Sequence, residues 1–339
     1  MLKSKFNLYL NFLKTKSILI TSHALADLDG LASAIALHFF FQSQLPSTTA
    51  ELYFSKVSKK AHLYIEKLKA KFSEFNPIFE DEIKNLDFEA AFILDTNKLN
   101  KVGGSFSAAD VDSLKDLFVV FIDHHYMDDP PIKEQQNRNA IIYEDYTSTS
   151  EIIVDLFNEF DINLPLPLRY LLIAGIIIDS GYLKFANQHT YKSMAYLLDE
   201  DMKYHEILSM LKVEPHISEK IAKIKGAQRV ELIRENDWLI GISHVSSFEA
   251  SVANTLIKIG FDIAIVLSER KDEVRVSLRA KQRICDQCAL HLGKMLEDIS
   301  EQMDAIGGGH DGAASIKIRK SETEIKTIIL AKIKEILNN

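Results

Sequence analysis

One junction decides the fold of this chain: Ser22-His23-Ala24-Leu25-Ala26-Asp27-Leu28-Asp29-Gly30, which joins an apolar run to a segment rich in small residues. Residues 17–20 predict a short buried strand before it, and residues 31–41 predict a helix that opens at Gly30. The imidazole and the two carboxylates of the junction are therefore expected where a strand ends and a helix begins, which is where open α/β sheets bind ligands. Desolvated like charges repel each other, so this grouping favours a bound divalent cation.

A helix cap is the alternative interpretation of this junction. Asp27 or Asp29 would then accept amide hydrogens at the start of the helix, and His23 would be a polar residue at the end of the strand. Aspartate before a helix is common, so the junction alone leaves both interpretations open. The rest of the chain favours the metal.

Three further apolar runs predict the other strands of a sheet. They cover residues 51–54, 90–94 and 117–122, and helical patterns separate them. Strands that are hydrophobic throughout and alternate with helices are typical of a parallel sheet with helices on its faces. Residues 1–198 are therefore predicted to form an α/β domain with a mainly parallel sheet flanked by helices.

Acidic residues and histidines follow these apolar runs. Asp95 follows the run at 90–94, Asp123-His124-His125 follows the next run, and Asp179 follows a long apolar helix predicted over residues 165–178. Because the carboxyl ends of parallel strands meet at one edge of a sheet, we expect these side chains to share one crevice with the first junction. Carboxylate and imidazole ligands without thiolate suit Mn²⁺ or Mg²⁺, and are compatible with Zn²⁺, Co²⁺ and Fe²⁺. Two such ions roughly 3.5–4 Å apart suit phosphoester hydrolysis.

The second part of the chain predicts a smaller mixed α/β domain over residues 218–339, after a polar linker at 199–217. Strands are expected at 229–233, 238–243, 261–268, 274–279 and 314–318, and helices at 248–259, 286–299 and 322–337. The third and fourth of these strands are spaced as a hairpin. Gly307-Gly308-Gly309-His310 predicts a glycine-rich turn whose backbone approaches a phosphate closely, with a tight connection that binds nothing as the alternative.

Composition excludes several classes of protein. The chain has 339 residues, of which 47% are hydrophobic and 26% charged, which suits a globular protein of about two domains. Its two cysteines, Cys285 and Cys288, cannot build a disulfide framework, and a helical pattern explains their spacing better than a zinc or redox site. No apolar stretch approaches eighteen residues and the start lacks a signal-peptide pattern, so we expect a cytoplasmic protein without membrane contact.

The charge is unevenly distributed. The net charge is −8; residues 1–202 hold 19 Lys and Arg against 28 Asp and Glu, a net of −9, and residues 203–339 hold 21 against 20, a net of +1. An acidic chain is poorly suited to an extended, salt-dependent grip on long nucleic acid. The acidic excess lies in the part for which metal is predicted.

Four spaced motifs resemble those of the DHH phosphoesterases. The first is His23-x-x-x-Asp27-x-Asp29-Gly30, the second is Asp95, the third is Asp123-His124-His125, and the fourth is Asp179-Ser180-Gly181, where Asp-Thr-Gly is commoner in the family. The C-terminal part resembles the DHHA1 domain through Gly307-Gly308-Gly309-His310 and the preceding Val276-Ser277-Leu278-Arg279. The family includes nanoRNases, pAp phosphatases and RecJ-type exonucleases, and the resemblance spans nearly the whole chain.

The resemblance implies that six side chains bind two Mn²⁺ ions, for which Mg²⁺ or Co²⁺ would substitute. One ion would be held by His23 and Asp27 and the other by Asp29, His124 and Asp179, with Asp95 bridging the two.

The remaining motif residues are implied to act on the substrate. His125 would face the scissile phosphate as a catalytic residue, and Asp123 would orient an imidazole through its second nitrogen. Substrate phosphate would be bound across a cleft between the two domains by Arg279, Gly308, Gly309 and His310. A solvated basic face is the alternative interpretation of Arg279, because other basic residues surround it in the sequence.

The leading hypothesis is a two-metal phosphodiesterase that degrades short RNA oligonucleotides to 5′-mononucleotides. The alternatives are a pAp 3′-phosphatase, a phosphodiesterase for linear or cyclic dinucleotides, a RecJ-like 5′–3′ single-strand exonuclease and a nucleotide-sensing regulatory protein. The sequence implies no obligatory protein partner and is compatible with a homodimer.

Overall fold

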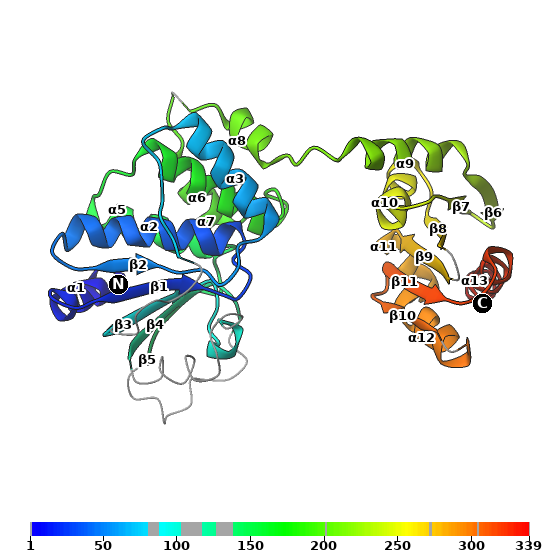
Figure 1. Ribbon diagram of the computed structural model, residues 1–339, viewed down its shortest axis with the longest axis horizontal. Helices are drawn as coiled ribbons and strands as arrows, with labels where there is room; N and C mark the ends of the chain where they lie inside the picture. Colours follow the sequence, from blue (N-terminus) through cyan, green and yellow to red (C-terminus); the bar gives the residue numbers. More distant parts are fainter. Residues whose placement is uncertain are drawn as a thin grey trace. The chain divides into compact units, whose positions relative to one another are not determined.

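The computed structural model describes residues 2–80, 88–102, 117–126, 138–200, 202–270, 273–303 and 305–338. The chain divides into two compact units, Met1–Val213 and Glu214–Asn339 (Figure 1). Among the described residues, no helix combines the length and apolar character needed to cross a lipid bilayer.

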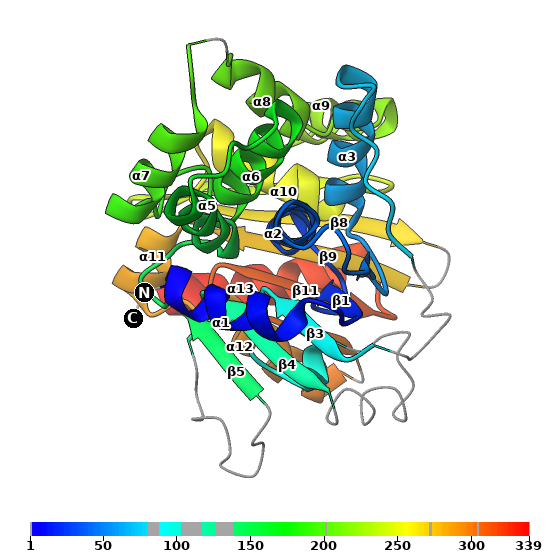
Figure 2. The same cartoon turned by 90° about the vertical axis from the view of Figure 1, so that its left-hand side faces the viewer.

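The first unit contains a sheet of five parallel strands, which confirms the predicted sheet. The strand order is β2-β1-β3-β4-β5, and Figure 2 shows β1, β3, β4 and β5 side by side. The strands are β1 (Ile18–Ser22), β2 (Ala50–Leu52), β3 (Ala90–Leu94), β4 (Phe118–Asp123) and β5 (Arg138–Ile142). Strand β5 was not predicted, because its five residues begin with the polar pair Arg138 and Asn139.

Both faces of this sheet are buried. Phe92 of β3 packs on α1 and α2, with ring centroids 4.8 Å from Phe41, and Figure 1 shows α2, α5 and α6 on this side. Leu19 and Phe121 lie in a second core on the opposite face, with Leu99 of the short 3₁₀ helix η1 (Leu99–Lys101). The helices are α1 (Leu2–Leu13), α2 (Leu28–Gln44), α3 (Lys59–Lys71), α5 (Thr149–Phe160), α6 (Leu166–Asp179), α7 (Gln188–Leu197) and α8 (Tyr204–Leu211).

Helix α2 lies at the centre of the first unit because its N-terminal half consists of small or apolar residues. Residues 28–37 are all buried, and α6 packs along the helix. Two glycines permit this close approach near the end of β1. A Cβ on Gly30 would lie 2.2 Å from Ser22 Oγ, and a Cβ on Gly175 of α6 would lie 3.2 Å from the Cα of Asp29. The start of α2 is thereby held against both β1 and α6.

The second unit contains a mixed sheet, which confirms the predicted mixed α/β domain; the sheet has six strands, where five were expected. Its order is β10-β11-β9-β8-β7-β6, and β8 and β9 form the predicted antiparallel hairpin. The strands are β6 (Glu231–Glu235), β7 (Trp238–His244), β8 (Ile263–Arg270), β9 (Glu273–Ala280), β10 (Ile306–Gly309) and β11 (Ala313–Ile318). The helices are α9 (Ile217–Gln228), α10 (Glu249–Ile259), α11 (Gln282–Cys288), α12 (Leu292–Met303) and α13 (Glu322–Leu337).

Three details differ from the sequence interpretation. The single helix expected at 286–299 is two helices, because Ala289 adopts a left-handed φ of 51° between α11 and α12. The glycine-rich stretch is the edge strand β10 and not a turn, because Gly307 and Gly308 pair with β11. Helix α8 lies within the stretch 199–217 predicted as linker, and its Ile207 is fully buried in the core of the first unit.

Candidate metal centre

The candidate site lies at the carboxyl edge of the parallel sheet, where the strand order changes direction. In the order 2-1-3-4-5 this point falls between β1 and β3, and His23 follows β1 while Asp95 follows β3. The two side chains meet there, with His23 Nε2 3.3 Å from Asp95 Oδ2 and 3.9 Å from Asp27 Oδ1. These three residues form a group whose ligand atoms all lie within 4.8 Å of one another.

Asp27 is the predicted helix cap and is also placed where it could bind a metal ion. Its Oδ1 accepts the amide hydrogens of Asp29 at 3.0 Å and Gly30 at 3.1 Å, so it is the N-cap of α2. The same side chain belongs to the group with His23 and Asp95. The capping bonds fix the carboxylate in place, and a carboxylate has further lone pairs with which to bind a cation.

A second group contains Asp29, Asp95, His124 and Asp179, with ligand atoms again within 4.8 Å of one another. The structure therefore brings together the two sets of side chains for which two metal ions were predicted, and Asp95 belongs to both sets. Asp95 is 4% exposed and has a φ of 60°, a left-handed conformation that aspartate tolerates better than most residues. This conformation directs the chain out of β3 at the point where the two groups meet.

Asp179 comes from the end of α6 and not from a strand. Its Oδ2 lies 2.9 Å from His124 Nε2, so the carboxyl ends of α6 and β4 meet at the site. Convergence of strand ends alone would not have placed it there.

His124 is arranged as a ligand by its second nitrogen. Nδ1 lies 3.3 Å from the carbonyl oxygen of Tyr146, to which it donates, and this places the lone pair of the neutral ring on Nε2. Nε2 is buried and makes no hydrogen bond with any described residue, although carboxylates of Asp179 and Asp95 lie 2.9 and 3.7 Å away. A buried imidazole nitrogen facing two carboxylates fits a divalent cation between them.

Asp29 is held by the start of α5. Its side chain is fully buried, and its two oxygens accept the amide hydrogens of Thr149 at 2.7 Å and Ser150 at 2.9 Å. Burial and then the charges of Asp95 and Asp179 raise the pKa of Asp29 well above its usual range. The helix amides stabilise the carboxylate only in part, and a cation would relieve the remaining repulsion.

The pKa values of Asp95, His23 and His124 are also raised, as expected where carboxylates outnumber positive charges. Burial raises the pKa of Asp95 to about 6, despite its contact with His23. Hydrogen bonds to Asp27 and Asp95 raise the pKa of His23 to about 10. Burial lowers the pKa of His124, but its contact with Asp179 and the charges of the nearby aspartates outweigh this and raise it to about 9. Without a cation, protons on these histidines balance the carboxylates, and metal ions would displace them.

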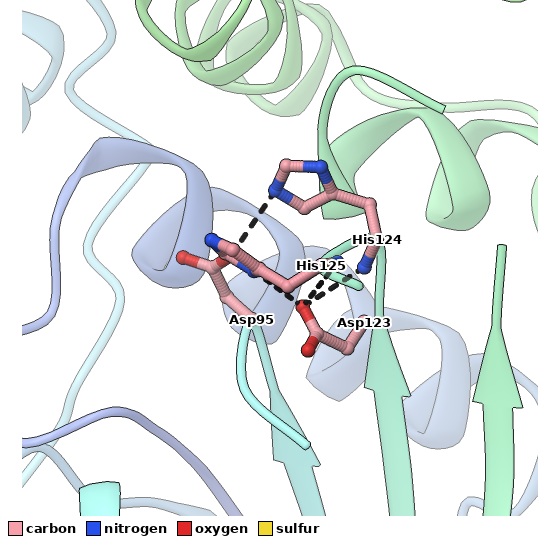
Figure 3. Close-up of side chains that lie close together, drawn as sticks. All are labelled: Asp95, Asp123, His124 and His125. Carbon is pink, nitrogen blue, oxygen red and sulfur yellow. Dashed lines mark hydrogen bonds and ion pairs between the residues drawn. The ribbon is translucent and has the colours of Figure 1, made fainter. Parts of the chain in front are cut away.

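Asp123 and His125 form a third arrangement with Asp95 and His124 (Figure 3). Asp123 is fully buried, and its Oδ1 accepts the amide hydrogens of His124 and His125 at 2.8 and 3.2 Å. The same oxygen lies 2.7 Å from His125 Nδ1, and this hydrogen bond is the main cause that raises the pKa of His125. The His125 side chain is 52% exposed, so a strand-end turn presents an oriented imidazole at the surface.

The four residues predicted to bind substrate phosphate lie in the second unit. Gly308 and Gly309 are in β10, His310 follows them, and Arg279 is in β9. Ala313 of β11 links these residues. It pairs with Arg279 of β9, and its carbonyl accepts the amide hydrogen of His310, which follows β10, at 2.8 Å. The structure thus brings all four to one end of one sheet.

The glycines of this group are fixed by backbone packing, whereas Arg279 is fixed by hydrogen bonds of its side chain. Gly308 and Gly309 have φ values of 155° and 149°, and Gly293 at the start of α12 contacts Gly309 so closely that a Cβ there would lie 2.1 Å from its carbonyl oxygen. The guanidinium of Arg279 donates from Nε to Asn254 Oδ1 at 3.1 Å and from an NH group to the Leu278 carbonyl at 2.8 Å.

Sequence reasoning missed the groups that hold the site residues. Ser148 is the N-cap of α5, and the acceptance of the Thr149 and Ser150 amide hydrogens by Asp29 was not foreseen. The Tyr146 carbonyl and Gly175 were also missed. Backbone groups carry no signal in a sequence, whereas the glycine inside an apolar helix was visible.

Two family models match the chain. The DHH family, N-terminal domain, matches residues 17–176, and the DHHA1 domain matches residues 250–339. The uncharacterized protein MJ0988 of Methanocaldococcus jannaschii is 35% identical over 332 residues, which cover 97% of this chain and 94% of that protein. This chain belongs to the DHH/DHHA1 phosphoesterase family.

Comparison with solved structures supports the fold in one case. An exopolyphosphatase-related protein from Bacteroides fragilis is 16% identical with a TM-score of 0.62, and the match covers 100% of this chain and 98% of that one. RecJ from Thermus thermophilus in complex with Mn²⁺ is 11% identical with a TM-score of 0.42, and the match covers 99% of this DHH chain and 54% of that one. The first likeness supports the fold alone.

Proposed function

We propose that this DHH-family protein hydrolyses the phosphodiester bonds of short RNA oligonucleotides to 5′-mononucleotides, with two divalent cations bound at the carboxyl edge of the parallel sheet. The observation that carries the proposal is the position of Asp95, which belongs both to the group with His23 and Asp27 and to the group with Asp29, His124 and Asp179. A carboxylate shared by two ligand groups suits a site with two closely spaced metal ions.

The donor set fits Mn²⁺, with Mg²⁺ or Co²⁺ as substitutes. Every candidate ligand is a carboxylate or an imidazole, and His124 Nε2 is buried without a hydrogen bond to any described residue. When bound, two such ions supply a Lewis acid for the phosphoryl oxygens and an activated water.

The protein's own residues would orient the substrate and stabilise charge. His125 is held through Nδ1 by Asp123, so its Nε2 can donate to a phosphoryl oxygen as negative charge develops there. Asp123 keeps the ring in that orientation and favours the protonated form. His124 is fixed through Tyr146, so it would serve as a ligand and not as an acid.

The second unit would bind a distal phosphate of the substrate. Arg279 offers a planar guanidinium, and His310 with the extended glycines of β10 offers a close backbone approach. We propose that these residues bind a substrate phosphate other than the one that is hydrolysed, and that this second contact favours short substrates. The acidic balance of the chain supports short substrates over long nucleic acid.

The test is a product analysis with defined substrates. The purified protein is incubated with Mn²⁺ and 5′-labelled RNA of two to twenty-four nucleotides, matching DNA, pAp and cyclic dinucleotides, and products are resolved by length. Preference for RNA of two to five nucleotides is expected. Preferential release of phosphate from pAp, cleavage of cyclic dinucleotides, or 5′–3′ degradation of long DNA would each replace the proposed substrate with another.

Metal binding is measured separately by calorimetry with Mn²⁺ on protein treated with a chelator. Binding of two ions per chain without turnover of any substrate would favour a nucleotide-sensing protein over an enzyme.

A further inference from the structure

A short loop after Asp179 carries two exposed aromatic side chains beside the candidate metal centre. Tyr182 is 58% exposed and Phe185 is 64% exposed, three and six residues after Asp179. Three residues span at most about 11 Å between Cα atoms, so Tyr182 lies within that distance of a candidate metal ligand. Single exposed apolar side chains are ordinary on a protein surface, whereas several exposed apolar side chains close to a candidate site can mark a binding surface.

The loop is ordered by its own hydrogen bonds. The amide of Tyr182 donates to the Ile177 carbonyl at 2.7 Å, and the amide of Phe185 donates to the Ser180 carbonyl at 3.0 Å. Ser180 is fully buried, and its hydroxyl accepts the amide hydrogen of Leu183 at 3.2 Å. The rings are thus carried by a fixed turn.

The turn has an unusual backbone. Gly181, Tyr182 and Leu183 have φ values of 62°, 59° and 67°, so two side-chain-bearing residues in succession adopt the left-handed conformation. Glycine at the end of α6 explains the first of these, because it completes a helix C-cap. No such reason explains the next two, and strained backbone of this kind is found where function requires a defined position.

The loop that carries the aromatic side chains begins where the loop of the oriented histidine begins. His124 and Asp179 meet at 2.9 Å, so the loop after α6 and the loop after β4 begin at the same place. Tyr126, directly after His125, is 71% exposed. If a substrate phosphate binds at the metal groups, the exposed aromatic side chains of the protein would therefore lie close to the other parts of that substrate.

We infer that Tyr182 and Phe185 form a base-stacking surface, which selects phosphoesters that carry a nucleobase over inorganic polyphosphates. This inference rests on the proposed function and adds the residues that recognise the base. Aromatic rings stack on any base, so the surface gives affinity for nucleotides without sequence preference. Phe185 packs along Gly181 and has Lys184 Nζ 5.1 Å from its ring centroid, so Tyr182 is assigned the larger share.

The test compares a dinucleotide with an otherwise identical abasic analogue. Stacking contributes about 5- to 150-fold per base, so Tyr182→Ala should raise the KM for the dinucleotide by that factor with kcat nearly unchanged. The abasic analogue should have a high KM with the unmodified protein and no further loss with Tyr182→Ala. Tyr182→Phe keeps the ring and should retain the low KM, and Phe185→Ala should show a smaller rise.

Tyr196→Ala is the matched control. Tyr196 is 39% exposed on α7, next to Leu197, whose carbonyl accepts from Arg169 at the opposite end of α6. Removing this exposed tyrosine should leave both KM values unchanged. Equal KM values for Tyr182→Ala and Tyr196→Ala would overturn the inference.

A binding measurement separates failure of the inference from failure of the proposed function. A dinucleotide that contains 2-aminopurine should lose fluorescence on binding to the unmodified protein, but not on binding to Tyr182→Ala. Quenching without hydrolysis of any substrate would overturn the proposed activity and leave the stacking surface intact. Hydrolysis without quenching would overturn the stacking surface and leave the proposed activity intact.

Discussion

The two predicted functional regions of this protein are built in different ways. In the first unit, Asp29, Asp95 and Asp123 are at most 4% exposed and are held by hydrogen bonds from several separate elements. In the second unit, Gly309 and His310 are exposed and are positioned by strand pairing and by contact with α12. Buried charges held by many partners suit chemistry, whereas an exposed backbone edge suits binding. Changes in the first region should therefore affect turnover and metal binding, and changes in the second should affect substrate affinity.

Asp95→Asn should have the largest effect. It removes the carboxylate shared by both ligand groups, and asparagine tolerates the left-handed backbone at this position. We expect Mn²⁺ affinity and kcat to fall by more than the about 10- to 100-fold that is typical when only a supporting partner is removed. Calorimetry with Mn²⁺ and single-turnover kinetics check this.

The same variant should stabilise the metal-free protein. Burial raises the pKa of Asp95 to about 6, so at pH 7 the ionised side chain destabilises the folded state relative to the unfolded state. A neutral asparagine removes that cost, and the melting temperature in the presence of a chelator should rise. Retention of two bound ions by Asp95→Asn would contradict the shared-ligand arrangement.

His125→Ala should separate chemistry from metal binding within the first region. The ring is 52% exposed and contacts Asp123, and it lies outside the two groups for which metal ions are proposed. We expect kcat to fall by about 10²- to 10³-fold, as when a group that stabilises phosphoryl charge is removed, with Mn²⁺ stoichiometry unchanged. The metal content of the variant is measured by elemental analysis. Loss of a bound ion would show that His125 is a metal ligand and contradict the prediction.

Gly175→Ala should loosen the metal centre without touching a ligand. The new Cβ would lie 2.6 Å from Ser150 Oγ and 3.2 Å from both the Cα and Oδ1 of Asp29, so Asp29 or α5 must shift. We expect Mn²⁺ affinity to weaken by about 10- to 100-fold, as for the loss of a supporting contact.

Gly226→Ala provides the comparison in the second unit. This glycine is also in a helix and buried, and a Cβ there would lie 2.3 Å from a methyl group of Val252. It should destabilise the protein by overpacking but leave Mn²⁺ affinity unchanged. If both variants weaken Mn²⁺ binding equally, the effect of Gly175→Ala reflects general destabilisation and not the position of Asp29.

The strands and acidic motifs of the first region were readable because their signals are local. Continuous apolar runs predicted β1, β3 and β4, and the polar residues directly after each run predicted the candidate site. The missed features depend on contacts between distant segments. Strand β5 is short and polar at its start, and the hold of α5 on Asp29 joins residues 120 positions apart through backbone amides.

In the second unit, the local sequence signals were clear but predicted the wrong structure at two places. Three consecutive glycines predict conformational freedom and hence a turn, but pairing with β11 makes them an edge strand. The helix expected at 286–299 was split because Ala289 adopts a left-handed conformation that is unusual for alanine. For the glycines, strand pairing with a distant segment outweighed the local preference, and such pairing cannot be derived from a local sequence rule.

Arg279→Ala and His310→Ala should raise KM and leave kcat and Mn²⁺ binding nearly unchanged. Loss of a charged hydrogen-bonding group costs about 1.5–3 kcal/mol, which corresponds to an increase of about 10- to 150-fold in KM for Arg279→Ala. His310 is exposed, so its effect should be smaller. Arg275→Ala, on the same strand with a side chain that is paired to Glu273, is the matched control. Unchanged KM for both Arg279→Ala and His310→Ala would remove the proposed phosphate site from the second unit.

The smallest expected effect tests whether the pH response of stability belongs to the metal centre alone. His38 lies on α2, and its Nε2 donates to the Ala50 carbonyl at 3.0 Å. Burial lowers its pKa below the ordinary value of 6.5, so the unfolded chain takes up this proton at a higher pH than the folded protein. The neutral ring therefore contributes stability that is fully present above pH 6.5 and is lost as the pH falls below it.

His38→Gln keeps a hydrogen-bond donor but cannot become charged. In urea unfolding, it should lose less stability than the unmodified protein between pH 7.5 and pH 5.5, and His62→Gln, at an exposed position of α3, should match the unmodified protein. If His38→Gln shows the same loss as His62→Gln, the buried ring on α2 contributes nothing to the acid sensitivity of folding.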